Sequence, residues 1–147
     1  MKKSREMEFL KILDFWLRQY NLIDSVIVQR DNRGDALAKV EEDDFNDEYI
    51  LRYNWKILCH YRKHTRIETI LHEIGHIIQN LLYNTEKQQI KSELEAEKFA
   101  LSTMKKHYPV HYRREVNRMK KQLKSKSYQK RLDRVHLTAY LQVEDYK

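Results

Sequence analysis

The segment from Thr65 to Tyr83 constrains the fold most, because its apolar residues recur with the period of an α-helix. At about 100° per residue these side chains fall on one side of the helix. They are Ile67, Ile70, Leu71, Ile74, Ile77, Ile78, Leu81 and Leu82. His72 and His76 fall on the other side. The segment therefore predicts an amphipathic helix that packs its apolar side on a core and directs two histidines away from that core.

The same segment contains the sequence His72-Glu73-Ile74-Gly75-His76. Residues four apart on a helix lie one above the other, so both imidazoles can reach one metal ion, and Glu73 projects about 100° round the axis toward water on that ion. This HExxH pattern predicts a catalytic site for one zinc ion per chain, with the histidines as ligands and Glu73 as proton acceptor. The alternative is a polar helix face that contains two histidines by chance.

Few residues in this chain break helices, since 147 residues include two glycines and one proline. The length fits one domain, 1–147, and leaves no room for a second of similar size. Cys59 is the only cysteine, so no internal disulfide can form, and a reducing, cytoplasmic setting is expected. Charged residues interrupt the apolar stretch near the N-terminus and no run approaches a membrane span, so we expect a soluble protein without a transmembrane segment.

The segments before the motif predict one helix and a small sheet. Ser4 to Tyr20 has apolar residues at helical spacing behind a serine cap. The segments 26–28 and 36–40 flank a turn-rich pentapeptide and predict a β-hairpin. The segments 49–51 and 55–61 predict one further strand, or two strands. Together with the helices that follow, this order predicts an α+β fold with about three strands.

A second helix is predicted from Ser92 to about His107, where Pro109 ends it. Glu93 and Glu97 share one face of that helix with a set of apolar residues. This set is Leu94, Ala96, Ala100, Leu101 and Met104. Burying carboxylates is costly unless a cation or hydrogen-bond donors meet them, so the pair indicates a metal. The alternative is that these glutamates only begin a helix, where negative charge suits the helix dipole.

The alanines on that face would let the second helix approach the two histidines closely. Glu93 would then complete a His-His-Glu ligand set and leave the fourth position of zinc for water, as a catalytic site requires. Cys59 is an alternative third ligand, but its strand-like apolar surroundings favour a buried core thiol.

The two motifs together resemble the HExGH and ExEAxxFA pair of the ImmA/IrrE-type metallopeptidases, and more broadly the gluzincins, over residues 48–101. The resemblance implies a zincin-like fold in which His72, His76 and Glu93 hold zinc and Glu73 is the base. It implies that Glu97 orients a ligand histidine, with a role as alternative ligand left open. It also implies an intracellular endopeptidase that cleaves a regulatory or DNA-associated protein.

Peptide hydrolysis also needs a donor that stabilises the tetrahedral oxyanion. Tyr83 follows His76 by seven residues, which places it on the same stripe of the predicted helix. His107 and Tyr108 lie near the end of the second helix. These three residues are the candidate donors, although each side chain can equally be a packing or surface residue.

The C-terminal part of the chain is strongly basic. Residues 105–134 hold 12 Lys and Arg against 2 Asp and Glu, whereas the whole chain has a net charge of +7. We expect a basic helical extension over 105–147, with a break near 125–127, that packs on the core. Its charge can attract nucleic acid, an acidic protein or anionic lipid. A nucleic-acid-binding or regulatory protein with a structural or inactive metal site is therefore the alternative function.

Overall fold

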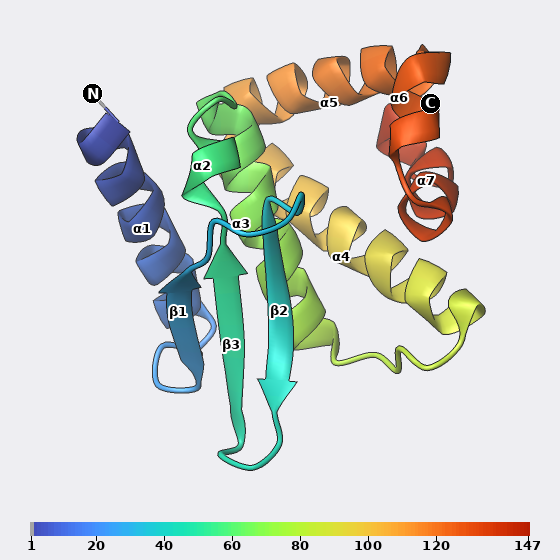
Figure 1. The fold of residues 1–147 in the computed structure, drawn as a ribbon. Helices are drawn as coiled ribbons and strands as arrows, with labels where there is room; N and C mark the ends of the chain where they lie inside the picture. The colour runs from blue at the N-terminus through green and yellow to red at the C-terminus, as the bar shows by residue number, and fades with distance from the viewer. Residues whose placement is uncertain (1) are drawn as a thin grey trace.

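The computed structural model describes residues 2–147 and shows an α+β fold (Figure 1). Within that range there are seven α-helices, one short 3-10 helix and a three-stranded mixed sheet. The elements are α1 (Lys2–Gln19), β1 (Val26–Arg30), β2 (Ala38–Asp43), β3 (Glu48–Tyr53), α2 (Trp55–Leu58), α3 (Lys63–Gln79), α4 (Glu86–His107), α5 (Pro109–Lys124), α6 (Lys126–Arg131), α7 (Arg134–Leu141) and η1 (Glu144–Tyr146). The expected α+β class and three-stranded sheet are confirmed. No helix among the described residues is long and apolar enough to cross a membrane.

Helix α1 ends within one residue of the predicted Tyr20 but begins at Lys2, so Ser4 lies inside the helix and is not its cap. The helix packs its apolar side into the main core. Phe9, Leu13, Trp16 and Leu17 are buried there, at the spacing of one helix face. Glu6 on the same helix accepts a hydrogen bond from the Tyr53 hydroxyl at 3.0 Å. Helix α1 is therefore tied to the sheet as well as to the core.

The predicted hairpin between 26–28 and 36–40 is wrong, because β1 and β2 are not neighbours. The strand order is β1-β3-β2, with β1 parallel and β2 antiparallel to β3. The loop between β1 and β2 straddles the end of β3: Asp31 N donates to Tyr53 O at 2.8 Å, and Asn54 N donates to Leu37 O at 2.9 Å. The apolar strand β3 thereby gains a hydrogen-bonded neighbour on each side, and its Leu51 is buried.

The strand predicted over 55–61 is also wrong, since this segment begins with the short helix α2. The Asn54 side chain caps α2 by accepting a hydrogen bond from Ile57 N at 3.3 Å. Trp55 and Leu58 are buried three residues apart, as one helix face requires. Cys59 follows in the same core, and no cysteine belongs to a potential metal-binding group among the described residues.

Helix α3 lies at the centre of the molecule and is covered on both sides. Its apolar side packs into the main core with α1 and the sheet, and its histidine side packs against α4 (Figure 1). The two histidines do face away from the main core, but His72 is buried by α4. The helix ends at Gln79, earlier than predicted, because Asn80 adopts a left-handed conformation with φ 44°. Ile78, in the last turn of the helix, and Leu82, in the loop after it, are exposed, although both were predicted on the core side.

The C-terminal helices lie against the far side of α4 (Figure 1). Helix α4 starts earlier than predicted, at a capping box formed by Thr85 and Gln88. The predicted break after α5 is present, and Ser125 caps α6 through Tyr128 N at 3.3 Å. A second core joins these elements, consisting of Leu101, Val116, Met119, Leu123, Val143 and Tyr146. The end of the chain is thus packed onto α4, the helix that carries Glu93.

Glu115 anchors α5 to the first turn of α3. Its side chain is fully buried; it accepts hydrogen bonds from Thr65 Oγ1 at 2.7 Å and from two Arg118 nitrogens at 2.8 and 2.9 Å. His64 Nδ1 lies 2.8 Å from the same carboxylate. Burial raises the pKa of Glu115, but the hydrogen bonds from Arg118, His64 and Thr65 outweigh it and hold the pKa at about 2.

Replacement of Glu115 by glutamine is expected to lower the free energy of unfolding by about 3 kcal/mol at pH 7. A depressed carboxyl pKa contributes stability above its unfolded value of 4.5, and that contribution is lost as the pH falls toward 2. The difference in the free energy of unfolding between wild type and Glu115→Gln, measured with urea, should therefore shrink as the pH falls from 4.5 to about 2. Glu95→Gln, which removes the partly exposed partner of Lys98, is the control and should cost less than about 1 kcal/mol. Equal losses of stability in the two variants would contradict the role of Glu115 as an anchor between α5 and α3.

Candidate metal centre

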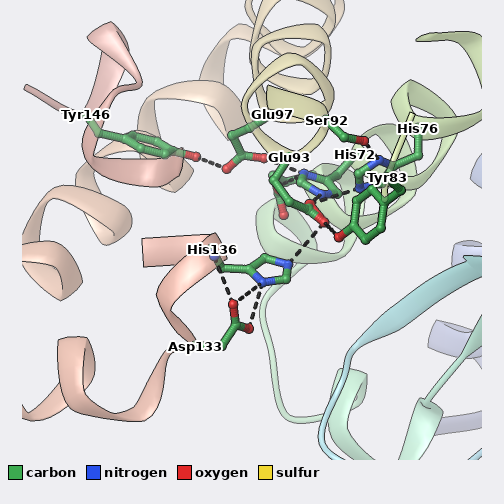
Figure 2. A network of polar contacts seen from close by, with 10 residues as sticks. His72, His76, Tyr83, Ser92, Glu93, Glu97, Asp133, His136 and Tyr146 are labelled. Carbon is green, nitrogen blue, oxygen red and sulfur yellow. Dashed lines mark hydrogen bonds and ion pairs between the residues drawn. The ribbon is translucent and has the colours of Figure 1, made fainter. Parts of the chain in front are cut away.

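Three predicted ligands meet between α3 and α4. His72 Nε2 and His76 Nε2 each lie 3.0 Å from Glu93 Oε2 (Figure 2). Each of the three side chains can offer one ligand atom, and these atoms lie within 4.8 Å of one another. The i, i+4 spacing of the histidines on α3 sets both rings toward α4, as the helix period requires. This buried His/Glu group can hold a metal ion.

The second nitrogen of each histidine also has a partner. His72 Nδ1 lies 2.9 Å from Glu97 Oε1, and His76 Nδ1 lies 3.1 Å from Ser92 Oγ (Figure 2). An Nδ1 hydrogen donated to these oxygens would leave each Nε2 lone pair directed toward the centre. The contacts therefore fix the rings in an orientation that suits metal ligands. Glu97 thus contacts the His72 ring nitrogen that does not face Glu93.

A deeper acidic group supports Glu97. Tyr146 of η1 donates its hydroxyl hydrogen to Glu97 Oε2 (Figure 2). Glu68, Glu97 and His72 form a second group that could hold a metal, with Glu68 Oε1 at 3.7 Å from His72 Nδ1. Burial and the charge of Glu97 raise the pKa of Glu68 well above its ordinary value. The two groups share His72, which faces Glu93 with Nε2 and Glu97 with Nδ1.

Glu73 lies beside the ligands without being one of them. Its side chain is buried, at 8% exposure. Burial raises its pKa, and the nearby His72 and His76 only partly offset that effect. Raising a carboxyl pKa toward neutrality suits a group that must accept a proton and later return it.

Two further side chains contact the other oxygen of Glu93. Tyr83 donates its hydroxyl to Glu93 Oε1 at 3.2 Å, and His136 Nε2 lies 3.3 Å from the same atom (Figure 2). Tyr83 comes from the loop after α3 rather than from the predicted helix. Asp133, which caps α7, lies 2.7 Å from His136 Nδ1. Burial lowers the pKa of His136, but Glu93 and Asp133 outweigh it and raise the pKa to about 9.

Sequence reasoning did not find Ser92, His136 or Asp133. The spacing of Asp133 and His136 is a local signal for a helix start, since an Asp cap commonly precedes the first turn. Nothing local connects that start with Glu93, which lies on another helix.

The structure does not bring His107 or Tyr108 to this centre. Both lie at the far end of α4, about 20 Å along the helix from Glu93. Tyr108 accepts a hydrogen bond from Trp16 Nε1 at 3.0 Å, and the His107 ring lies 5.1 Å from the Trp16 ring. These two side chains pack α4 against α1, and they are not available as oxyanion donors.

Gly75 permits the close approach of α3 and α4. A Cβ atom at this position would lie 3.1 Å from Ala96 Cα, from Ala96 O and from Phe99 Cδ1. Two of these three atoms are backbone, so they cannot rotate away. Ala96 is the residue of α4 that faces Gly75, and its small side chain was predicted to permit a close approach of the two helices.

Replacement of Gly75 by alanine is expected to lower the free energy of unfolding by about 1 to 2 kcal/mol. The overpacking cost exceeds the roughly 1 kcal/mol that alanine gains over glycine inside a helix. Because the helices must separate by a few tenths of an ångström, Glu93 should also move from the histidines and metal affinity should fall. Urea unfolding and zinc titration measure both effects. Ser102→Ala on the exposed side of α4 is the control, and a stabilised Gly75→Ala protein would refute the close-contact argument.

Comparison with known proteins returns no match: no family model, curated protein or solved structure is similar to this chain.

Proposed function

We propose that this protein is a zinc-dependent endopeptidase with a zincin-like arrangement of helices, of the gluzincin type and similar to ImmA/IrrE enzymes. The observation that carries the proposal is the convergence of His72 Nε2, His76 Nε2 and Glu93 Oε2. The buried Glu73 follows His72 in the chain, and the charges of all three side chains act on its carboxyl. An accidental polar face would not require a buried imidazole, a half-buried imidazole and a buried carboxylate to meet at one point.

The donor set and its spacing fit zinc. With metal–ligand bonds of about 2.0 to 2.1 Å, two donor atoms of a tetrahedral zinc site lie about 3.3 Å apart. The observed separations from Glu93 Oε2 to the histidine nitrogens are 3.0 Å. Nitrogen and carboxylate donors are the ligands of catalytic zinc, and three protein ligands leave one position for water. Zinc held there would polarise that water and bring its pKa toward neutrality.

The remaining steps belong to side chains of this protein. Glu73 accepts a proton from the attacking water at its carboxylate and then passes that proton to the leaving amine nitrogen. Tyr83 and His136 hold Glu93 through its second oxygen. To stabilise the developing oxyanion of the substrate, one of these two side chains would have to exchange its contact with Glu93 for a hydrogen bond to the substrate.

The sheet offers a binding edge for an extended peptide. Strand β2 is an outer strand of the sheet and packs beside α3 (Figure 1). An outer strand presents unpaired backbone groups to which a substrate backbone can bind. This edge supports cleavage within polypeptides, and the sequence resemblance favours an intracellular regulatory or DNA-associated protein as the substrate.

The experiment is digestion of a peptide pool by the zinc-loaded protein, with new peptide termini identified by mass spectrometry. The proposal expects termini that appear with wild-type protein and are absent after chelation or with Glu73→Gln. Termini that persist with Glu73→Gln would indicate a contaminating protease. A pool that remains uncut by pure, zinc-loaded protein would refute a general endopeptidase.

A further inference from the structure

A basic groove lies at the opposite end of α3 from the metal centre. It consists of two adjoining cavities of about 440 and 480 Å³. Both are lined by His60, Tyr61, Arg62, His64 and Arg114. The first cavity continues to Arg5 on α1, and the second continues along α5 to Lys121. The groove begins about 12 Å along α3 from His72, so it is separate from the metal site.

The groove contains more cationic side chains than nearby carboxylates can neutralise. Among the described residues, Arg5, Arg62, Arg114 and Lys121 form no ion pair. Lys63 and Arg66 share a single carboxylate, that of Glu8, at 3.4 and 3.8 Å. The positive end of the α3 dipole points to the same place. The groove therefore presents several uncompensated positive charges to an anionic ligand.

His111 adds a polar atom that lacks a partner. Its Nδ1 is buried in the wall of the first cavity and makes no hydrogen bond to a described residue. Burial and the neighbouring Lys63 and Arg114 lower the pKa of His111. A basic cavity that contains an unsatisfied nitrogen is suited to a ligand with hydrogen-bonding groups as well as negative charge.

Tyr61 gives the groove an aromatic surface. Its side chain is 37% exposed and lines both cavities, and the Arg118 guanidinium carbon lies 5.8 Å from the ring centroid. Cations that follow a phosphate backbone beside an aromatic ring that stacks on a base are the features that bind single-stranded nucleic acid. From His111 to Lys121 the helix α5 extends about 15 Å, which is enough for several phosphates of one strand.

We propose that the basic groove binds single-stranded nucleic acid. Arg62, Arg114 and Lys121 contact backbone phosphates, and a base stacks on Tyr61. A lipid surface is the poorer fit, because interfacial binding needs large side chains such as Trp, Phe or Leu next to the cations, and none of these residue types lines either cavity. The groove gives the protein a nucleic-acid partner whether or not the metal centre cleaves peptides.

The test is fluorescence anisotropy of a labelled oligothymidylate long enough to cross the groove, titrated with the full chain at several salt concentrations. Arg62→Ala/Arg114→Ala should weaken binding at least about tenfold and reduce the slope of log affinity against log salt by about 1.4, since each single-strand phosphate contributes about 0.7. Lys130→Ala/Arg131→Ala removes the same charge from exposed positions on α6 and should change affinity less than about twofold. Equal losses in the two double variants would overturn the groove as the site.

Tyr61 distinguishes single strands from other polyanions. Tyr61→Ala should weaken binding at least about fivefold, and Tyr61→Phe should retain it, because stacking needs the ring and not the hydroxyl. A duplex that binds as tightly as the single strand, or an acidic peptide that competes equally well by charge, would overturn the proposal. All titrations are repeated with chelator and with Glu73→Gln. Unchanged binding in both would show that the groove acts independently of the proposed peptidase, and binding that disappears with either would overturn a separate site.

Discussion

Replacement of Glu73 by glutamine is expected to reduce peptide hydrolysis by about 100-fold to 10,000-fold, the usual contribution of a positioned general base. Glutamine has nearly the same shape as glutamate but cannot accept the proton of an attacking water. Because Glu73 lies beside the ligand set and is not part of it, the variant should still bind one zinc ion per chain. Initial cleavage rates and zinc content of the same preparations measure the two effects together.

Glu95→Gln is the matched control for that experiment, because Glu95 lies on α4 near the centre and, among the described residues, forms an ion pair with Lys98 alone. It should keep both zinc and activity. If Glu73→Gln lost zinc along with activity, Glu73 would be a ligand and the assignment of the base would fail. If Glu73→Gln, purified free of contaminating protease, cleaved at the wild-type rate, another group would have to move the proton.

The part of the centre that sequence predicts is the part governed by helix geometry. The positions of His72 and His76 follow from i, i+4 spacing, and the face that carries Glu93 and Glu97 follows from the same period on a second helix. Ala96 and Ala100 signal that the second helix can approach the histidines closely, and in the structure Ala96 packs against Gly75, whose role in that approach was not predicted. These features are readable because each depends on residues within a few turns of one helix.

The sheet shows where local reasoning fails. The segments 26–28 and 36–40 read as a hairpin, because they flank a turn-rich pentapeptide and consecutive strands usually pair. In the structure β3 lies between them instead. The two ends of the loop 31–37 form backbone hydrogen bonds with Tyr53 and Asn54, at the C-terminal end of β3. Which strand becomes central depends on long-range hydrogen bonds that periodicity does not encode. Asn54 is different, because its helix-capping role was a local signal that could have predicted α2.

His136 shows the same limit in the metal centre. Its contact with Glu93 requires α7 to pack on α4, and that packing is set by the second core, which gathers Leu101, Val116 and Val143 from three parts of the chain. No spacing rule places a histidine on one helix beside a glutamate on another when the connection is this long. Tyr83 was predicted on the helix, but the helix ends at Gln79. Tyr83 lies near the histidines all the same, because the loop after Asn80 brings its hydroxyl into contact with Glu93.

Replacement of Glu93 by alanine is expected to remove most of the zinc affinity. The change deletes one of three ligands and leaves Tyr83 and His136 without their shared acceptor. Zinc content after gel filtration should fall from one ion per chain to a small fraction. Zinc should also stop raising the unfolding temperature, because a ligand present at 100 times its dissociation constant stabilises by about 2.7 kcal/mol and a ligand that no longer binds adds nothing. Glu95→Ala on the same helix is the control and should keep its zinc.

Glu97→Gln separates a ligand from a group that only orients one. Because Glu97 contacts His72 Nδ1, its loss should weaken zinc binding by about 10-fold to 100-fold, the usual effect of removing a partner of a ligand histidine. Glu93→Ala should cost considerably more. Unfolding of both variants is compared in chelator, so that any loss of metal-free stability is measured separately from zinc affinity. If Glu93→Ala kept its zinc while Glu97→Gln lost it, the deeper group of Glu68, His72 and Glu97 would be the metal site, and the His72, His76 and Glu93 assignment would be wrong.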